Sequence, residues 1–225
     1  MKSIISRGDC QVRYQQEQAG WKADRRDAIV LTAAELFLKE GVQQVSMVRI
    51  AEACELGVAT LYRYFGTKAS ILVEAGTLLW ADLGRLFEGF FASDGYRTKS
   101  GMAQMEELLG FSVMLYQRHA PFLRFLREFD TFVLAEQVPK EKLAAYEASV
   151  LNLYPLFEAA YAKACGEGTA RPGIDLHLLY SSVSHALVCM SQKFLQGDVL
   201  QSDASADKEA ELRQLLELTL AYLRA

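Results

Sequence analysis

The sequence has few residues of the kinds that interrupt helices or cross-link chains. It contains 4 prolines and 4 cysteines among 225 residues, and the cysteines form no Cys-x-x-Cys pair. Such sparse cysteines exclude a disulfide scaffold and indicate reduced thiols. No apolar run approaches the roughly 18 residues of a membrane span, and the N-terminus lacks the apolar segment of a secretory signal peptide. We therefore expect a cytoplasmic protein that does not cross a membrane.

A large excess of charge of one sign is also missing. Lys+Arg 24 against Asp+Glu 28 leaves a net charge of -4. Residues 1–68 hold 10 basic and 8 acidic side chains, which gives +2, and residues 69–225 hold 14 and 20, which gives -6. A small basic excess at one end is compatible with a nucleic-acid partner, but it is far from the basic footprint that identifies one. Charge alone therefore does not decide the class of partner.

Helical periodicity runs through most of the chain. Hydrophobic residues make up 51% and charged residues 23% of the sequence, as in globular proteins. No useful stretch has the period of a strand, so the predicted fold class is all-α. Pro155 predicts a break near Tyr154, and residues 1–21, which carry no sustained period, are expected to form a flexible N-terminal tail. The expected helices cover residues 24–40, 46–54, 58–65, 68–91, 101–119, 121–135, 140–164, 174–196 and 207–224.

Two of the expected helices are short and lie close together. Ser46 can cap the first of them, and apolar residues recur at helical spacing from Met47 to Cys54. The pattern breaks at residues 55–57 and restarts with Val58, Leu61 and Phe65. Two short helices joined by a three-residue break are typical of a helix-turn-helix, although a simple helical hairpin has a similar pattern.

The residues of this region also carry a family resemblance. Residues 46–68 read SMVRIAEACELGVATLYRYFGTK. This run closely resembles the DNA-binding segment of the TetR/AcrR family of transcriptional regulators, and the resemblance covers about residues 22–72. It implies an N-terminal three-helix helix-turn-helix domain over residues 22–67. It also implies a larger helical domain over residues 68–225 that binds an effector and dimerises.

One residue of the turn departs from the family pattern. Glu55 stands where the family usually has glycine. A glutamate there is expected to adopt a left-handed backbone conformation, which costs about 1 kcal/mol or more for a residue with a Cβ atom. We expect the turn to survive this departure.

The predicted DNA contacts follow from the helical period. The N-terminal part of the second helix of a helix-turn-helix meets base edges, where hydroxyl, methyl and guanidinium groups can read sequence. Tyrosine hydroxyls and a capped helix start suit phosphate oxygens, and the resemblance places a phosphate contact at the lysine that begins the next helix. The tyrosines alone would also suit packing between helices. The predicted DNA-binding residues are Ser46, Val58, Ala59, Thr60, Tyr62, Arg63, Tyr64 and Lys68.

Aromatic and methionine side chains are concentrated in the C-terminal part. Most of them are expected to form a helical core, and some are candidates for an apolar effector pocket between helices. Their character favours a small apolar or aromatic effector. The candidate pocket residues are Trp80, Met114, His119, Phe122, Phe125, Phe129, Tyr146 and Tyr154.

Two C-terminal segments carry apolar stripes suited to a two-fold interface of four helices. The alternative is that the last helix is buried within its own subunit. The candidate dimer-interface residues are Leu179, Val183, Leu187, Met190, Leu212, Leu215, Leu216, Leu220 and Leu223.

The sequence contains no arrangement that indicates catalysis. It lacks a nucleophile triad order, a phosphate-cradling glycine loop and clustered metal ligands. No catalytic residue, metal site or cofactor is therefore predicted. The predicted function is a ligand-responsive DNA-binding regulator, a repressor that binds a palindromic operator as a homodimer. The alternative is an all-helical interaction module that has lost specific DNA binding.

Overall fold

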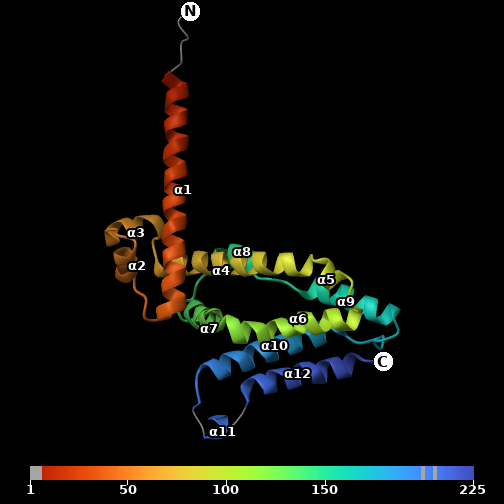
Figure 1. The fold of residues 1–225 in the computed structure, drawn as a ribbon. Coiled ribbons are helices and arrows are strands. Elements are labelled where there is room, and N and C mark those ends of the chain that lie inside the picture. The colour runs from red at the N-terminus through yellow and green to blue at the C-terminus, as the bar shows by residue number, and fades with distance from the viewer. Residues whose placement is uncertain (1–6, 199–200, 205–206) are drawn as a thin grey trace, which may run out of the picture.

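The computed structural model describes residues 7–198, 201–204 and 207–225, with side chains from Asp24 onward except at positions 202 and 204. All regular elements in these ranges are helices. The β-type pairing in these ranges is limited to one isolated antiparallel bridge between Ala170 and Arg224. The all-α prediction is confirmed (Figure 1). The helices are α1 (Arg7–Glu40), α2 (Met47–Ala53), α3 (Val58–Phe65), α4 (Lys68–Phe91), α5 (Asp94–Arg97), α6 (Gly101–Arg118), α7 (Ala120–Ala135), α8 (Lys140–Ser149), α9 (Tyr154–Gly166), α10 (Leu176–Leu195), α11 (Gln201–Ala204) and α12 (Lys208–Leu223).

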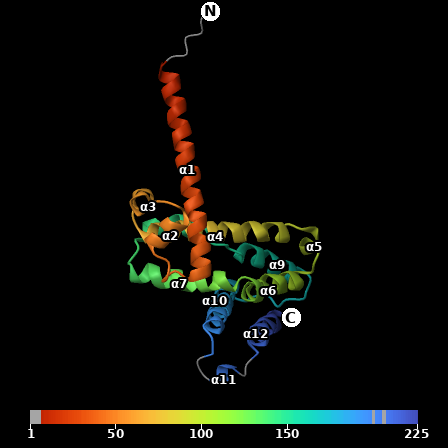
Figure 2. The same cartoon turned by 60° about the vertical axis from the view of Figure 1, so that its left-hand side comes forward.

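Helix α1 is longer than the sequence pattern predicts. It begins at Arg7, so residues 7–21 are helical where a tail without regular structure was expected. Its N-terminal half projects away from all the other helices (Figures 1 and 2). The sequence of this half has no apolar stripe, but a helix already formed extends at little cost through Gln, Glu, Ala and Arg. Residues 1–6 of the expected tail lie outside the described residues.

The C-terminal half of α1 forms a compact unit with α2 and α3. Ile29, Ala33 and Phe37 are buried, and α1 packs against α2, α4 and α7. Gly41 ends α1 with a φ of 89°, a conformation that glycine adopts without strain. The three-helix unit therefore rests on α4 and α7 instead of standing apart.

In the view of Figure 1, α8 lies beside α4, and α6, α7, α9, α10 and α12 form a larger bundle below it. Helix α4 runs from the three-helix unit to α5 and covers α7 and α8, while α6 packs closely on α9. A Cβ atom added to Gly101 would lie 2.3 Å from the Ala164 backbone nitrogen, so a glycine is required at this approach. Pro155 lies in the first turn of α9 and separates it from α8, which confirms the predicted break. No helix in the described ranges combines the length and apolarity needed to cross a membrane.

Helices α10 and α12 pack on α6 at the lower face of the bundle. Most of the residues predicted for a dimer interface are buried here within the single chain, so they have almost no surface left for a partner. This assignment is therefore corrected for Val183, Leu187, Leu212, Leu216, Leu220 and Leu223. Leu179, Met190 and Leu215 are partly buried against the same core. The predicted stripes follow the helix faces that contact α6, and an interface with a second chain would need the opposite faces.

Candidate nucleic-acid interface and effector pocket

Helix α2 begins as its sequence predicts. The Ser46 hydroxyl accepts a hydrogen bond from the Arg49 backbone N–H at 3.1 Å, which satisfies one free donor of the first turn. Arg49 also donates to Glu40 at the end of α1, with 2.7 Å between Nη2 and Oε1. This hydrogen bond lowers the pKa of the Glu40 carboxyl. The start of α2 is thereby tied to the end of α1, and Ser46 remains exposed.

The turn between α2 and α3 keeps its hydrogen bonds despite the glutamate. Glu55 has a φ of 54°, so the predicted left-handed conformation is confirmed. The Leu56 N–H donates to the Ala51 carbonyl at 2.8 Å, which closes the C-terminus of α2. The strain is local, and the turn survives the departure from glycine as expected.

Helix α3 divides into a buried and an exposed face. Leu61 and Phe65 are buried, as the period predicts. Ala59, Tyr62 and Arg63 are exposed. Val58, Thr60 and Tyr64 are partly buried at the edge of the exposed face. The exposed face thus carries small, aromatic and basic groups, a combination that suits a DNA groove.

Lys68 lies at the start of α4 but points back into the protein. Its Nζ donates to the Val42 carbonyl at 2.5 Å and lies 5.0 Å from the Phe132 ring centre. Burial lowers the pKa of the Lys68 ammonium, while Glu136 and Glu128 oppose that shift. The Val42 N–H in turn donates to Glu128 of α7 at 2.5 Å. The predicted phosphate contact of Lys68 would require its ammonium to leave Val42.

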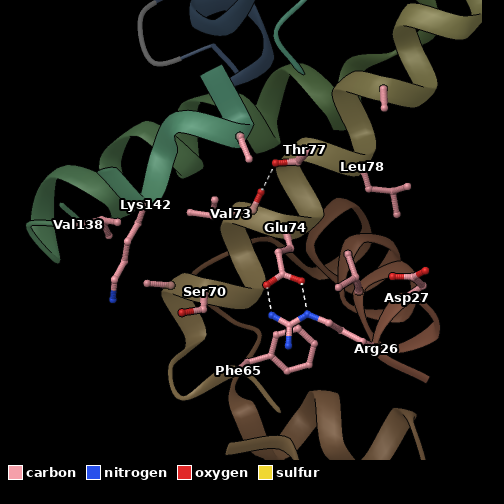
Figure 3. Close-up of a pocket in the computed structure, with 14 residues that line it drawn as sticks. Arg26, Asp27, Phe65, Ser70, Val73, Glu74, Thr77, Leu78, Val138 and Lys142 are labelled. Atoms are coloured by element: carbon pink, nitrogen blue, oxygen red, sulfur yellow. Dashed lines mark hydrogen bonds and ion pairs between the residues drawn. The ribbon is translucent and has the colours of Figure 1, made fainter. Parts of the chain in front are cut away.

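Arg26 connects α1, α3 and α4 (Figure 3). Its Nε donates to Glu74 Oε2 at 2.9 Å, and Nη2 forms a second bond to Oε1 of the same carboxylate. Its Nη1 donates to the Tyr64 carbonyl at 2.6 Å, and the guanidinium lies 4.3 Å from the centre of the Phe65 ring. One side chain therefore fixes the C-terminal turn of α3 against two other helices.

The Arg26–Glu74 pair lies in a groove of about 740 Å³ at this junction. Lys142 of α8 and Val73, Thr77 and Leu78 of α4 also line this groove (Figure 3). The groove is bounded on one side by the three-helix unit and on the other by α4 and α8. A change in the spacing of these two parts would alter the groove.

A second pocket, of about 770 Å³, lies between α4, α6 and α12. Its apolar wall includes Phe87, Phe91 and Phe111, and the rings of Phe87 and Phe111 meet edge to face at 4.2 Å. Polar side chains of α6 and α12 complete the lining. A cavity of this size with an aromatic wall lies in the volume range of small-molecule sites. We call it the α4–α6–α12 pocket.

Comparisons with known proteins agree with this geometry. Residues 29–75, which include the whole helix-turn-helix, match the family described as bacterial regulatory proteins, tetR family. Residues 29–75 therefore carry a DNA-binding segment of the TetR-family type. The HTH-type transcriptional repressor KstR of Mycolicibacterium smegmatis is 29% identical over 147 residues, which span 64% of this chain and 65% of KstR. The matched stretch is thus just under two thirds of the length of KstR.

Solved structures extend the likeness to the helical bundle. The TetR-family repressor FadR of Thermus thermophilus, in complex with lauroyl-CoA, has a TM-score of 0.56 at 21% identity and covers 88% of this chain and 94% of its own. The ketosteroid regulator KstR2 of Mycobacterium tuberculosis has a TM-score of 0.56 at 16% identity, with coverage of 89% and 95%. At these identities the likeness concerns the fold.

The structure separates the candidate pocket residues into three groups. Met114 and His119 line the α4–α6–α12 pocket. Tyr154 lies apart, with its ring 5.1 Å from that of His177. The other five, which pack together in one aromatic cluster between α4, α7 and α8, are Trp80, Phe122, Phe125, Phe129 and Tyr146. Packing with one another accounts for the aromatic character of these five.

Three residues that the structure makes important were not predicted from the sequence. Arg26 holds α3, Glu128 binds the Val42 N–H, and Glu107 lies in the wall of the α4–α6–α12 pocket. Arg26 and Glu74 are 48 positions apart, and Val42 and Glu128 are 86 apart. Partners so distant leave no local pattern in a single sequence.

Proposed function

We propose that this chain is a ligand-responsive transcriptional repressor that binds a palindromic operator as a homodimer. A small, largely apolar effector in the α4–α6–α12 pocket releases it. The observation that carries the proposal is the capped helix-turn-helix whose second helix, α3, exposes Ala59, Tyr62 and Arg63. The match of residues 29–75 to the TetR family supports DNA binding, and the lauroyl-CoA complex of FadR supports a partly apolar effector. The regulator would act in the cytoplasm and has no proposed catalytic role.

A homodimer would place two copies of α3 on the two half-sites of the operator. Half-sites one helical turn apart are about 34–36 Å from centre to centre. The proposed interface uses the exposed faces of α10 and α12, where Leu178, Leu218 and Tyr222 are 63%, 59% and 51% exposed. Large apolar side chains in such positions are suited to contact with a second chain.

Two helices link the proposed effector site to the DNA-binding unit. Helix α4 begins at Lys68 beside α3, and its last turns line the pocket. Helix α7 follows His119 of the pocket and carries Glu128, which binds the Val42 N–H. An effector that binds better to an arrangement with altered half-site spacing would shift the population toward it. Lys68 contributes to the coupling because its ammonium can contact either the Val42 carbonyl or a DNA phosphate.

The experiment that tests the proposal is selection of bound fragments from a random duplex library, followed by a salt titration of the best site. An inverted repeat whose affinity falls steeply with salt is the expected result. Arg63→Ala should weaken binding at least about tenfold if it reads a base, since one bidentate contact is worth about 1–3 kcal/mol. Arg124→Ala, an exposed arginine on α7, is the matched control.

Lys68→Ala and Tyr64→Ala test the phosphate contacts. Each should weaken binding to all sequences, and Lys68→Ala should also reduce the salt slope by about 1. An unchanged slope for Lys68→Ala would mean that its ammonium stays on Val42 in the complex. No enriched site for a folded, ligand-free dimer would favour the alternative of an all-helical interaction module.

A further inference from the structure

The aromatic side chains that line the α4–α6–α12 pocket indicate the chemical character of its ligand. Phe87 and Phe111 meet edge to face, and the Phe91 ring centre lies 6.1 Å from that of Phe87. Aromatic faces and edges of this kind favour a flat or aromatic apolar group. The greater part of the ligand is therefore apolar.

The charges around the pocket cancel. Three basic and three acidic side chains line it: Lys99, Arg118 and Arg213, and Glu106, Glu107 and Glu217. An ionic ligand would lose hydration without a net opposite charge to replace it. The balance of charge therefore favours a neutral ligand.

Glu107 supplies a polar anchor on α6. One of its carboxylate oxygens, Oε1, pairs with Lys99, which already balances its charge. The other, Oε2, is buried and has no hydrogen-bond partner within the described part of the chain. A buried acceptor without a donor is unfavourable, so the Glu107 carboxylate keeps the capacity to accept a further hydrogen bond. Glu107 lines the pocket, and because the terminal torsion of glutamate is broad, rotation of its carboxylate can present an oxygen to a bound ligand.

We propose that this pocket binds a neutral, largely apolar molecule that carries a hydroxyl group, and that the hydroxyl donates a hydrogen bond to Glu107. The inference rests on the proposed function only in taking the pocket as the effector site. A hydroxyl fits better than an ammonium group because Lys99 would repel a second cation at the same carboxylate. A carboxylate ligand would be repelled by Glu107 itself and could not donate to it.

A set of probes with one common ring system tests the ligand class on the unchanged full-length protein. The probes are 2-naphthol, 2-methylnaphthalene, 2-naphthoate and 2-naphthylmethylamine, titrated by calorimetry. They differ in one substituent, which is a neutral donor, a methyl group, an anion or a cation. We expect 2-naphthol to bind most tightly, about tenfold better than 2-methylnaphthalene, which is typical of a hydrogen bond to a charged acceptor.

Glu107→Gln tests the anchor. Its single amide oxygen is needed by Lys99, so 2-naphthol and 2-methylnaphthalene should then bind within about twofold of each other. Glu88→Gln is the matched control, because Glu88 is an exposed carboxylate on α4 outside the pocket lining, and it should keep the tenfold preference. The probe series on the unchanged protein decides the question even if the Glu107 variant folds poorly.

Operator binding measured in parallel separates the two proposals. Tighter binding of 2-naphthoate or 2-naphthylmethylamine than of 2-naphthol would overturn the ligand class. A preference for 2-naphthol that persists in Glu107→Gln would overturn the anchor. If a protein that binds its operator binds none of the probes, the ligand class is wrong and the DNA-binding proposal stands. If 2-naphthol binds through Glu107 without changing operator affinity, the ligand class stands and the effector role fails.

Discussion

The contacts of Arg26 show how one residue positions the DNA-reading helix. The side chain joins a carboxylate of α4, a carbonyl of α3 and the Phe65 ring. Its partner Glu74 is about one third exposed, as is Arg26, so water screens the ion pair. The bond to the Tyr64 carbonyl matters most for geometry because it holds the last turn of α3 directly.

Arg26→Ala should lower the free energy of unfolding by about 1–2 kcal/mol, through loss of a screened ion pair, a backbone hydrogen bond and a cation–π contact. Urea unfolding followed by circular dichroism measures this. The control is Arg25→Ala, which removes an exposed arginine at the neighbouring position. Equal stability of the two variants would show that the Arg26 contacts contribute nothing to folding.

The phenol group of Tyr146 makes the stability of the protein depend on pH in the alkaline range. Burial raises its pKa to about 12, while the hydrogen bond from Trp80 opposes that shift. An unfolded tyrosine has a pKa near 10, so the unfolded chain loses this proton first as the pH rises. The folded state then binds more protons than the unfolded state, and stability falls between about pH 10 and pH 12.

Tyr146→Phe should remove this part of the pH dependence, which is at most about 1.4 kcal/mol per pH unit for one proton. It should also lower stability near pH 7 by about 1 kcal/mol, because the Trp80 N–H loses its acceptor. Urea midpoints from pH 8 to pH 12 supply the data. Tyr62→Phe, at an exposed site on α3, should leave the curve unchanged. A similar alkaline slope in Tyr146→Phe and the unchanged protein would contradict this account.

At the scale of elements, α4 contacts its neighbours differently along its length. A Cβ atom at Gly76 would lie 2.8 Å from Tyr146 Cε2 and 3.2 Å from Phe129 Cε2. These two rings are stacked at 4.2 Å and fix each other, so they cannot move apart easily. At Gly84, two turns further along, a Cβ atom would meet nothing within 4 Å. The same residue type therefore has a packing role at one position and none at the other.

Gly76→Ala and Gly84→Ala should change stability in opposite directions. Gly76→Ala should destabilise the protein by about 1–3 kcal/mol, because the methyl group overpacks the aromatic cluster. Gly84→Ala should stabilise it by about 0.5–1 kcal/mol through helix propensity alone. Thermal unfolding distinguishes them by the sign of the shift. A stabilised Gly76→Ala variant would mean that α4 and α8 do not pack as described.

At the scale of the whole molecule, the proposed homodimer depends on the faces of α10 and α12 that do not contact α6. Leu218→Glu should weaken association by about tenfold or more, because a charge placed in an apolar interface costs at least about 1.4 kcal/mol. Sedimentation velocity across a range of concentrations measures the change. Leu134→Glu, at a 77% exposed leucine of α7, is the control. An effect of Leu134→Glu alone would place the interface elsewhere.

Local patterns predicted the elements well because short-range physics decides them. Ser46 caps α2, Thr67 caps α4, and Pro155 separates α8 from α9, each through backbone groups a few residues away. The N-terminal half of α1 was missed because a helix that packs on nothing carries no apolar period. The sequence shows the apolar stripes of α10 and α12. A stripe of this kind does not indicate whether its residues are buried within their own chain or against a second chain.

The sequence by itself determined the all-α class, the helix-turn-helix with its unusual Glu55 and the TetR-family resemblance, because all three depend on residues close together in the chain. Only the tertiary structure decided which side chains meet across long intervals. It placed Lys68 on Val42, Arg26 on the end of α3 and Glu107 in the wall of a pocket. The physical reason is that side-chain pairing depends on how helices cross, and a single sequence does not specify those crossings locally.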